Sequence, residues 1–261
     1  MRVEIELSST SLRRGASLMG VLLIALLCTS CATGTGHNTS WTNIRMAAGE
    51  AITDRATWMP LVAAGVFAID DFDEEVTEWA SDKTPLFGSQ SRADDSSDTL
   101  AALSHVTLGV AAIPSFNKLE TLAPALGAHL INFGFTQASK ENINRERPDK
   151  DGSESFPSGH TSYAVVSAIQ ASNLIDQLDI SRTGKRNFRI ANYSVAGLAA
   201  WARVEANRHY PSDILTSIAL GNFATGFVNR LLEENINNRN QVLRLDTNGN
   251  TGIRFSYAYS W

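Results

Sequence analysis

Apolar segments of helical length recur through most of this chain, and they constrain its fold more than any other feature. They lie at residues 58–69, 100–113, 119–135, 159–178, 188–205 and 211–234. Polar residues such as His105, Asn132 and Arg203 interrupt them, so no run of about 18 apolar residues remains after the first part of the chain. The pattern predicts an all-α helical bundle over residues 46–235. The alternative is a protein whose helices cross a membrane several times.

Residues 241–261 have a different pattern. Short apolar stretches flank Asn248-Gly249, and aromatic side chains alternate with small or polar ones from Ile253 to Trp261. Asn-Gly between alternating stretches is a strong signal for a β-hairpin. We expect a short C-terminal β-hairpin that packs on the helical domain. Contact of its aromatic face with a membrane or a partner is the alternative.

The N-terminal part of the chain has the pattern of an export signal. Arg13-Arg14 precedes a short apolar stretch at 18–27, and small residues precede Cys31. The stretch is too short to span a bilayer comfortably, which favours a signal peptide over residues 1–30 rather than an uncleaved membrane helix. Residues 32–45 are polar and rich in Gly, Thr and Asn, which is typical of a flexible tether.

Cys31 resembles the lipidated cysteine of the bacterial lipoprotein lipobox, although Cys28 stands where that pattern usually has leucine. The resemblance implies that Cys31 carries lipid and that residues 31–45 tether the domain to a membrane. Ala32, rather than an aspartate, follows the cysteine, and this implies the outer membrane. The expected location is the periplasmic face of the bacterial cell envelope.

Composition limits the other classes of site. Cys28 and Cys31 are the only cysteines, so disulfides and cysteine-ligated zinc are excluded from the rest of the chain. A net charge of −5 at pH 7 gives no basic field for binding nucleic acid. The acidic run at 70–75 is interpreted as a solvated helix end or loop rather than a metal site, because no histidine accompanies it. Residues 81–98, rich in Ser and Asp, are expected to form a surface loop.

Three short segments carry the candidate chemistry: Lys140 to Pro148, Pro157 to His160, and Arg203 to Asp213. Their candidate residues are Lys140, Arg147, Ser158, Gly159, His160, Arg203, His209 and Asp213. Arginine offers a planar fork and lysine a point charge, so the three cations can neutralise the oxygens of a phosphoryl group. The helix start at Ser158-Gly159 adds free N–H groups, a close backbone approach and a hydroxyl donor.

The two histidines of these segments suit two different roles. His209 lies four residues before Asp213, so the carboxylate can accept the proton of one ring nitrogen and leave the other nitrogen free to attack phosphorus. His160 lies at a helix start and can protonate the leaving oxygen, then activate water. The remaining histidines are expected to be surface or structural residues at His37 and His129, and a core or packing residue at His105.

This set of motifs resembles the type 2 phosphatidic acid phosphatase (PAP2) superfamily, which includes bacterial class A acid phosphatases and vanadium-dependent haloperoxidases. That pattern is Lys-x6-Arg-Pro, Pro-Ser-Gly-His and Ser-Arg-x5-His-x3-Asp, and it departs here only at Ala202, where serine is common. The resemblance implies an all-helical core of the PAP2/haloperoxidase type. It also implies a phosphohistidine on His209 held by Asp213, acid–base catalysis by His160, and phosphate binding by the other motif residues.

The resemblance further implies hydrolysis of phosphomonoesters or lipid (pyro)phosphates with no cofactor and no metal site. The substrate is then a phosphorylated lipid or a small molecule, and the membrane is a partner only through the N-terminal lipid. A vanadium-dependent haloperoxidase using the same site is the rival enzyme class, but those chains are typically much longer. A non-catalytic envelope lipoprotein is the third alternative.

Overall fold

The computed structural model describes residues 41–116 and 118–242, and all of the regular secondary structure there is helical. The elements are α2 (Trp41–Thr53), α3 (Arg55–Phe67), α4 (Phe72–Lys83), α5 (Gln90–Ala112), the 3-10 turn η1 (Ile113–Ser115), α6 (Leu119–Asn142), α7 (Gly159–Asp176), α8 (Arg182–Glu205) and α9 (Pro211–Val242). The predicted all-α class is therefore confirmed. The predicted signal peptide, Cys31 and residues 243–261 of the predicted hairpin lie outside the described residues.

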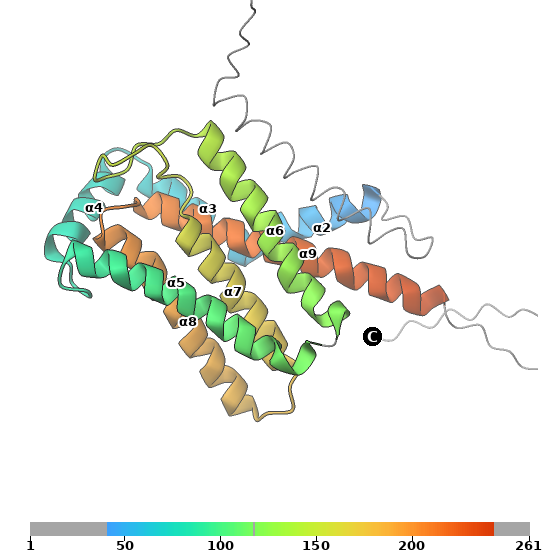
Figure 1. The fold of residues 1–261 in the computed structure, drawn as a ribbon. Helices are drawn as coiled ribbons and strands as arrows, with labels where there is room; N and C mark the ends of the chain where they lie inside the picture. Colours follow the sequence, from blue (N-terminus) through green and yellow to red (C-terminus); the bar gives the residue numbers. More distant parts are fainter. Residues whose placement is uncertain (1–40, 117, 243–261) are drawn as a thin grey trace, which may run out of the picture.

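Helix α7 is the centre of the bundle. It packs against α5, α6, α8 and α9, while α2 and α3 pack on α9, and α4 contacts α8 and α9 at one end (Figure 1). α5 and α6 are joined through η1 and diverge from there, with α7 between them. Residues of both helices line a cavity near the end of the bundle that carries the motif segments.

Small side chains allow the central helices to approach closely. Ala164 and Ala168 of α7 pack against Ala196 and Ala199 of α8 in one buried cluster. At the α7–α9 crossing, a Cβ built on Gly221 would lie 2.9 Å from a methyl group of Val165 and 3.0 Å from a backbone carbonyl of α7. The tight crossing holds the start of α9 against the start of α7, where two motif segments lie.

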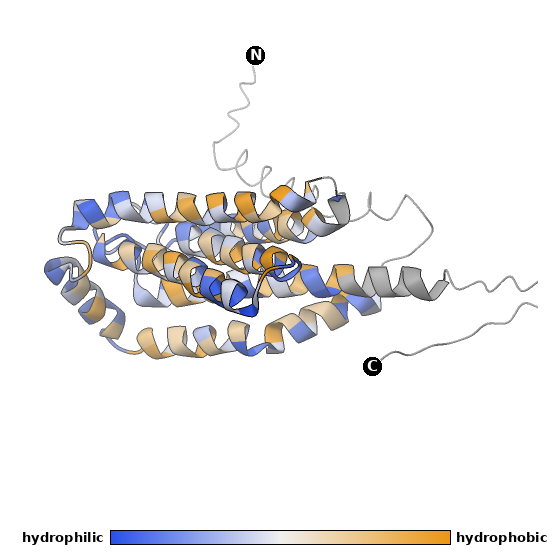
Figure 2. Ribbon diagram, turned by 90° about the horizontal axis from the view of Figure 1, so that it is seen from below, coloured by the Kyte–Doolittle hydropathy of each residue, from blue (hydrophilic) through white to orange (hydrophobic). Residues whose placement is uncertain are grey.

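Large apolar side chains lie mainly on the outside of the bundle. Trp58, Met59 and Val62 of α3 and Val106 and Val110 of α5 are all exposed. The hydropathy colouring shows hydrophobic and hydrophilic residues interspersed along most helices (Figure 2). Within residues 41–116 and 118–242, no helix combines the length and the apolar character needed to span a bilayer.

Several boundaries differ from the prediction. α5 begins at Gln90, after Ser89 accepts a hydrogen bond from the Arg92 N–H at 3.2 Å, so most of the expected loop at 81–98 is helical. Its buried face consists of small residues such as Ala93 and Ser97, which a search for large apolar residues overlooks. Helical structure also begins at Trp41, ahead of the predicted boundary, and α9 extends over residues 241 and 242 of the predicted hairpin.

Candidate active site

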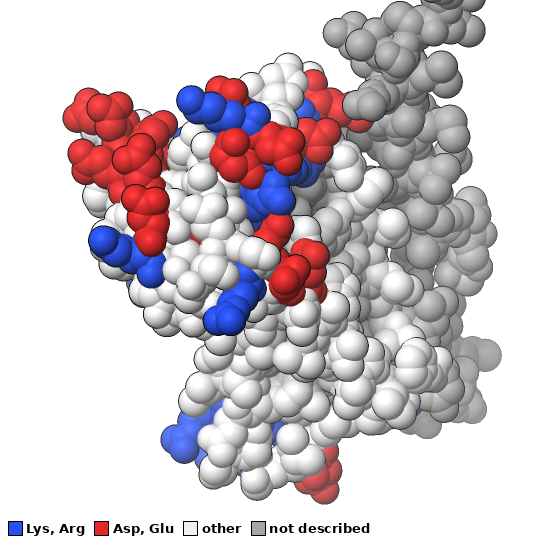
Figure 3. Space-filling view, turned by 60° about the vertical axis from the view of Figure 1, so that its left-hand side comes forward, with Lys and Arg blue, Asp and Glu red and all other residues white. Residues whose placement is uncertain are grey.

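The three motif segments meet at one end of the bundle. There, acidic and basic side chains lie side by side over the upper part of the face in Figure 3, whereas most of the lower part is uncharged. A cavity of about 630 Å³ opens at this end. The predicted residues in its wall are Lys140, Arg147, Gly159, His160, Arg203 and His209. Asp213 and Ser158 lie behind the wall.

The cations of the cavity have donors that the protein leaves unsatisfied. The Nε atoms of Arg147 and Arg203 are buried and have no partner among the described residues. The other end of Arg203 donates to Asp94 at 2.6 Å and to Ser97 at 3.0 Å, while Lys140 Nζ donates to the Glu154 carbonyl at 2.9 Å. A buried N–H without an acceptor raises the free energy of the folded protein. The wall therefore suits an anion that accepts hydrogen bonds from the Nε–H groups of Arg147 and Arg203.

Repulsion among the cations of the cavity also indicates a site for an anion. Burial lowers the pKa of Lys140, and the nearby Arg147 and Arg203 lower it further, although Glu154 acts in the opposite direction. Burial also lowers the pKa of Arg203, with Asp94 opposing it. Cations that destabilise one another in an empty cavity are stabilised together by a bound phosphate.

The start of α7 adds backbone donors to this wall. The N–H groups of Gly159 and His160 have no hydrogen-bond partner among the described residues, and Gly159 lines the cavity. The Ser158 side chain has a different role from the one expected. It is buried as the N-cap of α7, where its hydroxyl accepts from the Thr161 hydroxyl at 3.1 Å and its N–H donates to Ser217 at 2.7 Å. Its hydroxyl is therefore a structural cap outside the cavity wall.

His209 is held as a neutral ring. Its Nδ1 lies 2.6 Å from the Ser155 carbonyl oxygen, and because a carbonyl can only accept, Nδ1 carries the proton. Burial, and then the positive charge of Arg203, lowers the pKa of His209 well below its ordinary value. The side chain is buried but lines the cavity, so the unprotonated Nε2 is the nitrogen available to a ligand.

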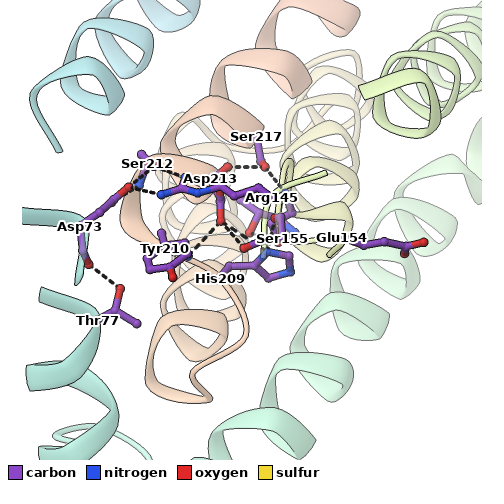
Figure 4. Close-up of polar contacts among 12 residues, drawn as sticks. Asp73, Thr77, Arg145, Glu154, Ser155, His209, Tyr210, Ser212, Asp213 and Ser217 are labelled. Atoms are coloured by element: carbon purple, nitrogen blue, oxygen red, sulfur yellow. Dashed lines mark hydrogen bonds and ion pairs between the residues drawn. The ribbon is translucent and has the colours of Figure 1, made fainter. Parts of the chain in front are cut away.

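Asp213 does not hold the His209 ring as the sequence predicted. Its Oδ2 lies 3.9 Å from His209 Nδ1, beyond hydrogen-bonding distance. That oxygen instead accepts from the Ser155 hydroxyl at 2.6 Å and from the Tyr210 N–H at 3.0 Å (Figure 4). Asp213 therefore fixes Ser155, and the Ser155 carbonyl fixes His209. Burial raises the pKa of Asp213, although Arg145 and these hydrogen bonds act to lower it.

Arg145 links this arrangement to α4, and the sequence analysis missed it. Its Nη1 lies 2.7 Å from Asp213 Oδ1, its Nη2 lies 2.8 Å from Asp73 Oδ2, and its guanidinium lies 4.2 Å from the ring centre of Tyr210. Asp73 also accepts from the Ser212 N–H at 2.9 Å and from the Ser212 hydroxyl (Figure 4). Asp73 is 1% exposed, so the interpretation of residues 70–75 as wholly solvated is wrong at this position.

α5 supplies two more residues that the sequence analysis assigned to a loop. Asp98 Oδ1 lies 2.9 Å from His160 Nε2, and Asp94, one turn earlier, bonds Arg203 and Arg208. Burial and Arg203 lower the pKa of His160, whereas Asp98 acts to raise it. The four-residue spacing of the two aspartates places them on one helical face, which is the signal that a helix prediction over this segment would have revealed.

The structure also places two other residues near the motif segments. His105 is a packing residue but not a core one: it is exposed, lines the cavity, and packs against the His129 and Tyr163 rings. Arg208, next to His209 in the chain, pairs with Asp94, Asp149 and Asp151 and does not line the cavity. Among the residues that the structure describes, no group of three or more His, Cys, Asp or Glu side chains is arranged to hold a metal ion.

Comparison with known proteins gives three similarities. Residues 121–237 match the model of the PAP2 superfamily. Over 102 residues, 38% of this chain and 21% of the other, the sequence is 34% identical to a lipid A 1-phosphatase of Porphyromonas gingivalis, so the chain spans about a fifth of that relative. A crystal structure of a transmembrane PAP2-type phosphatidylglycerolphosphate phosphatase from Bacillus subtilis has a TM-score of 0.39 and 19% identity, covering 87% of this chain and 98% of that one. This last similarity is too low to carry a functional argument.

Proposed function

We propose, from the PAP2 superfamily domain that residues 121–237 form, that this chain is a metal-independent phosphatase that acts through a phosphohistidine on His209. One observation carries the proposal. The unpaired buried donors of Arg147 and Arg203 and the unprotonated Nε2 of the neutral His209 ring belong to the same cavity. An anion binder and a nucleophile in one cavity are the two requirements of phosphoryl transfer through histidine.

The first step transfers the phosphoryl group to the enzyme. Arg147, Arg203 and Lys140, with the free N–H groups of Gly159 and His160, bind the phosphate oxygens. His209 Nε2 attacks phosphorus, a P–N bond forms, and the P–O bond to the leaving group breaks on the opposite side. His160, as imidazolium, donates its proton to the departing oxygen, and Asp98 stabilises that imidazolium.

The second step regenerates the enzyme. Neutral His160 accepts a proton from water while the water oxygen attacks phosphorus, and the P–N bond breaks. His209 returns to its neutral form with Nδ1–H still donating to the Ser155 carbonyl. Inorganic phosphate leaves, and His160 again carries the proton that starts the next cycle. The cations supply the charge stabilisation that a metal ion supplies in other phosphatases.

The substrate we propose is a phosphorylated lipid, with a small phosphomonoester as the other candidate. The relative named lipid A 1-phosphatase supports a lipid, because its similarity to this chain extends over 102 residues.

We further propose that Cys31 carries lipid and anchors the domain at the periplasmic face of the outer membrane. Replacing Cys31 with Ser should then release the protein from the membrane fraction, and retention of the variant would favour an anchor within the polypeptide.

Phosphate release in excess EDTA tests the proposed activity. We expect purified protein in detergent to release phosphate from phosphatidate and from p-nitrophenyl phosphate at the same rate with and without EDTA. Arg203→Met should reduce that rate, because it removes the most buried cation of the cavity. Arg189→Met changes an exposed arginine that pairs with Asp176 and does not line the cavity, and it is the control. Activity that EDTA abolishes and magnesium restores would contradict the metal-independent mechanism.

A further inference from the structure

The cavity extends beyond the cations, between α5 and α6. On α7, Tyr163 follows His160 by one turn, and on α5, His105 lies seven residues, or about 10 Å, beyond Asp98. On α6, Gln137 lies one turn before Lys140 and also lines the cavity. The extension thus runs along α5 and α6 away from the phosphate-binding end. In that direction the two helices converge on η1 (Figure 1).

Two aromatic rings of the cavity wall, His105 and Tyr163, pack with a third ring, His129, which does not itself line the cavity. The ring centres of His105 and His129 are 5.7 Å apart, and the Tyr163 ring lies 6.5 Å from His105 and 6.3 Å from His129. His105 Nδ1 donates to the Ala101 carbonyl at 2.7 Å, which leaves Nε2 as an acceptor in the neutral ring. Burial, with a smaller effect of His105, lowers the pKa of His129 to about 4, so this ring is uncharged near neutral pH.

Charge is distributed unevenly along the cavity. Lys140, Arg147 and Arg203 all lie at the phosphate-binding end. Among the described residues of the wall, the extension adds no lysine or arginine and contributes one carboxylate, Asp98, beside His160. A second phosphate bound next to the first would therefore lie near the Asp98 carboxylate with no lysine or arginine of the extension beside it. Repulsion between the two negative charges disfavours its binding.

In-line transfer fixes where the leaving group lies. His209 Nε2 attacks from one side of phosphorus, so the leaving oxygen departs on the other side, toward the proton on His160. Beyond His160, the wall continues with Tyr163 on α7 and with Ala101, Ala102 and His105 on α5. The alcohol part of the substrate is therefore directed over the aromatic rings.

We propose that His105 and Tyr163, with His129 packed against both rings, form a leaving-group subsite for an uncharged alcohol, so that the enzyme hydrolyses phosphomonoesters in preference to diphosphates of the same alcohol. This inference rests on the proposed phosphatase function. The rings supply an apolar surface together with imidazole and phenol groups that can bond a hydroxyl. The absence of a cation from the described wall of the extension supplies the selection against a second phosphate.

Geranyl phosphate and geranyl diphosphate are the matched probes, because they differ only in the second phosphate. We expect kcat/KM of the wild-type protein to be at least about tenfold higher for the monophosphate. Gln137→Lys should raise the ratio of kcat/KM for the diphosphate to that for the monophosphate several-fold, because it adds a cation to the extension. Gln137→Leu is the matched control and should not favour the diphosphate.

The kinetics of a His105 variant test the ring subsite separately. His105→Ala should lower kcat/KM for geranyl phosphate about tenfold and leave the inhibition constant of inorganic phosphate unchanged, since phosphate alone occupies only the cationic end. Wild-type protein that hydrolyses the diphosphate as well as the monophosphate would overturn this inference and leave the proposed function intact. No phosphate release from any substrate would overturn both.

Discussion

His209 Nδ1 donates its proton to the carbonyl oxygen of Ser155 at 2.6 Å, and the Asp213 carboxylate is 3.9 Å from the same nitrogen. The carboxylate thus acts on the nucleophile indirectly, through Ser155. It holds the Ser155 hydroxyl at 2.6 Å, and Ser155 in turn presents its carbonyl to the ring. A backbone acceptor fixes the ring tautomer without placing a negative charge against it.

This indirect arrangement predicts the effect of changing Asp213. A carboxylate bonded directly to a catalytic histidine is worth about 10⁴-fold in kcat in the serine proteases. Because Asp213 acts through Ser155, Asp213→Asn should cost about 10²-fold or less, and Ser155→Ala, which keeps the carbonyl, should cost less again. Steady-state kcat of the two variants and of the double variant checks this. The double variant should lose no more than Asp213→Asn alone, because both changes break one bond. A loss near 10⁴-fold in Asp213→Asn would show that the carboxylate contacts the ring during turnover.

Arg145 should matter for stability more than for chemistry. Arg145→Met leaves Asp73 and Asp213, both buried, without their shared counter-ion. Removing one partner of a buried ion pair typically costs about 3–5 kcal/mol, so unfolding in urea should occur at clearly lower concentration. Adding Asp73→Asn to Arg145→Met should restore part of the loss. An unchanged urea midpoint in Arg145→Met would contradict a stabilising role for its ion pairs with Asp73 and Asp213.

The pH dependence of turnover should report the pairing of Asp98 with His160. His160 must be protonated to act as an acid, so kcat/KM for an alkyl phosphate falls as pH rises through its pKa. Asp98 acts to raise that pKa. Asp98→Asn removes this effect, so the falling limb should move to lower pH. Asp95→Asn, exposed on the same helix, is the control and should leave the profile unchanged. A limb that moves to higher pH in Asp98→Asn would contradict the pairing.

Two glycines test the close packing that supports the site. A Cβ at Gly221 would meet Val165 and the backbone of α7 at 3.0 Å or less, so Gly221→Ala should destabilise the fold by about 1–3 kcal/mol. Nothing lies within 4 Å of a Cβ at Gly197, and this residue is inside α8. Gly197→Ala should stabilise by about 0.4–1 kcal/mol. Urea unfolding of both variants checks the sign of each change, and stabilisation by Gly221→Ala would contradict the tight α7–α9 crossing.

The motif residues could be predicted from the sequence because their chemistry and spacing are local. Lys140, Arg147, His160, Arg203 and His209 carry distinctive side chains at fixed intervals, and the structure brings them into one cavity. The all-α class was also predictable, because the apolar segments and their proline and glycine boundaries are local features.

The partners of these residues depend on tertiary packing and were not predictable in the same way. Asp73 is 72 residues from Arg145, and Asp94 is 109 residues from Arg203, so no spacing rule connects them. Asp94 and Asp98 were further hidden because α5 buries alanine and serine rather than large apolar residues. Asp213 was assigned the wrong partner, because a four-residue interval does not reveal that the Ser155 carbonyl lies nearer to the ring.

The central claim is that phosphate passes through Nε2 of His209 while His160 handles the proton. Acid-quench trapping of phosphohistidine, with mass-spectrometric identification of the modified residue, tests it in wild-type protein and in the His209→Ala and His160→Ala variants. We expect phosphate on His209 in the wild type and none in His209→Ala, which should have no turnover. His160→Ala should retain or accumulate the phosphoenzyme with p-nitrophenyl phosphate, whose leaving group needs little acid assistance, and lose about 10²–10⁴-fold with alkyl phosphates. Phosphate on His160, or equal trapping in wild type and His209→Ala, would contradict the account.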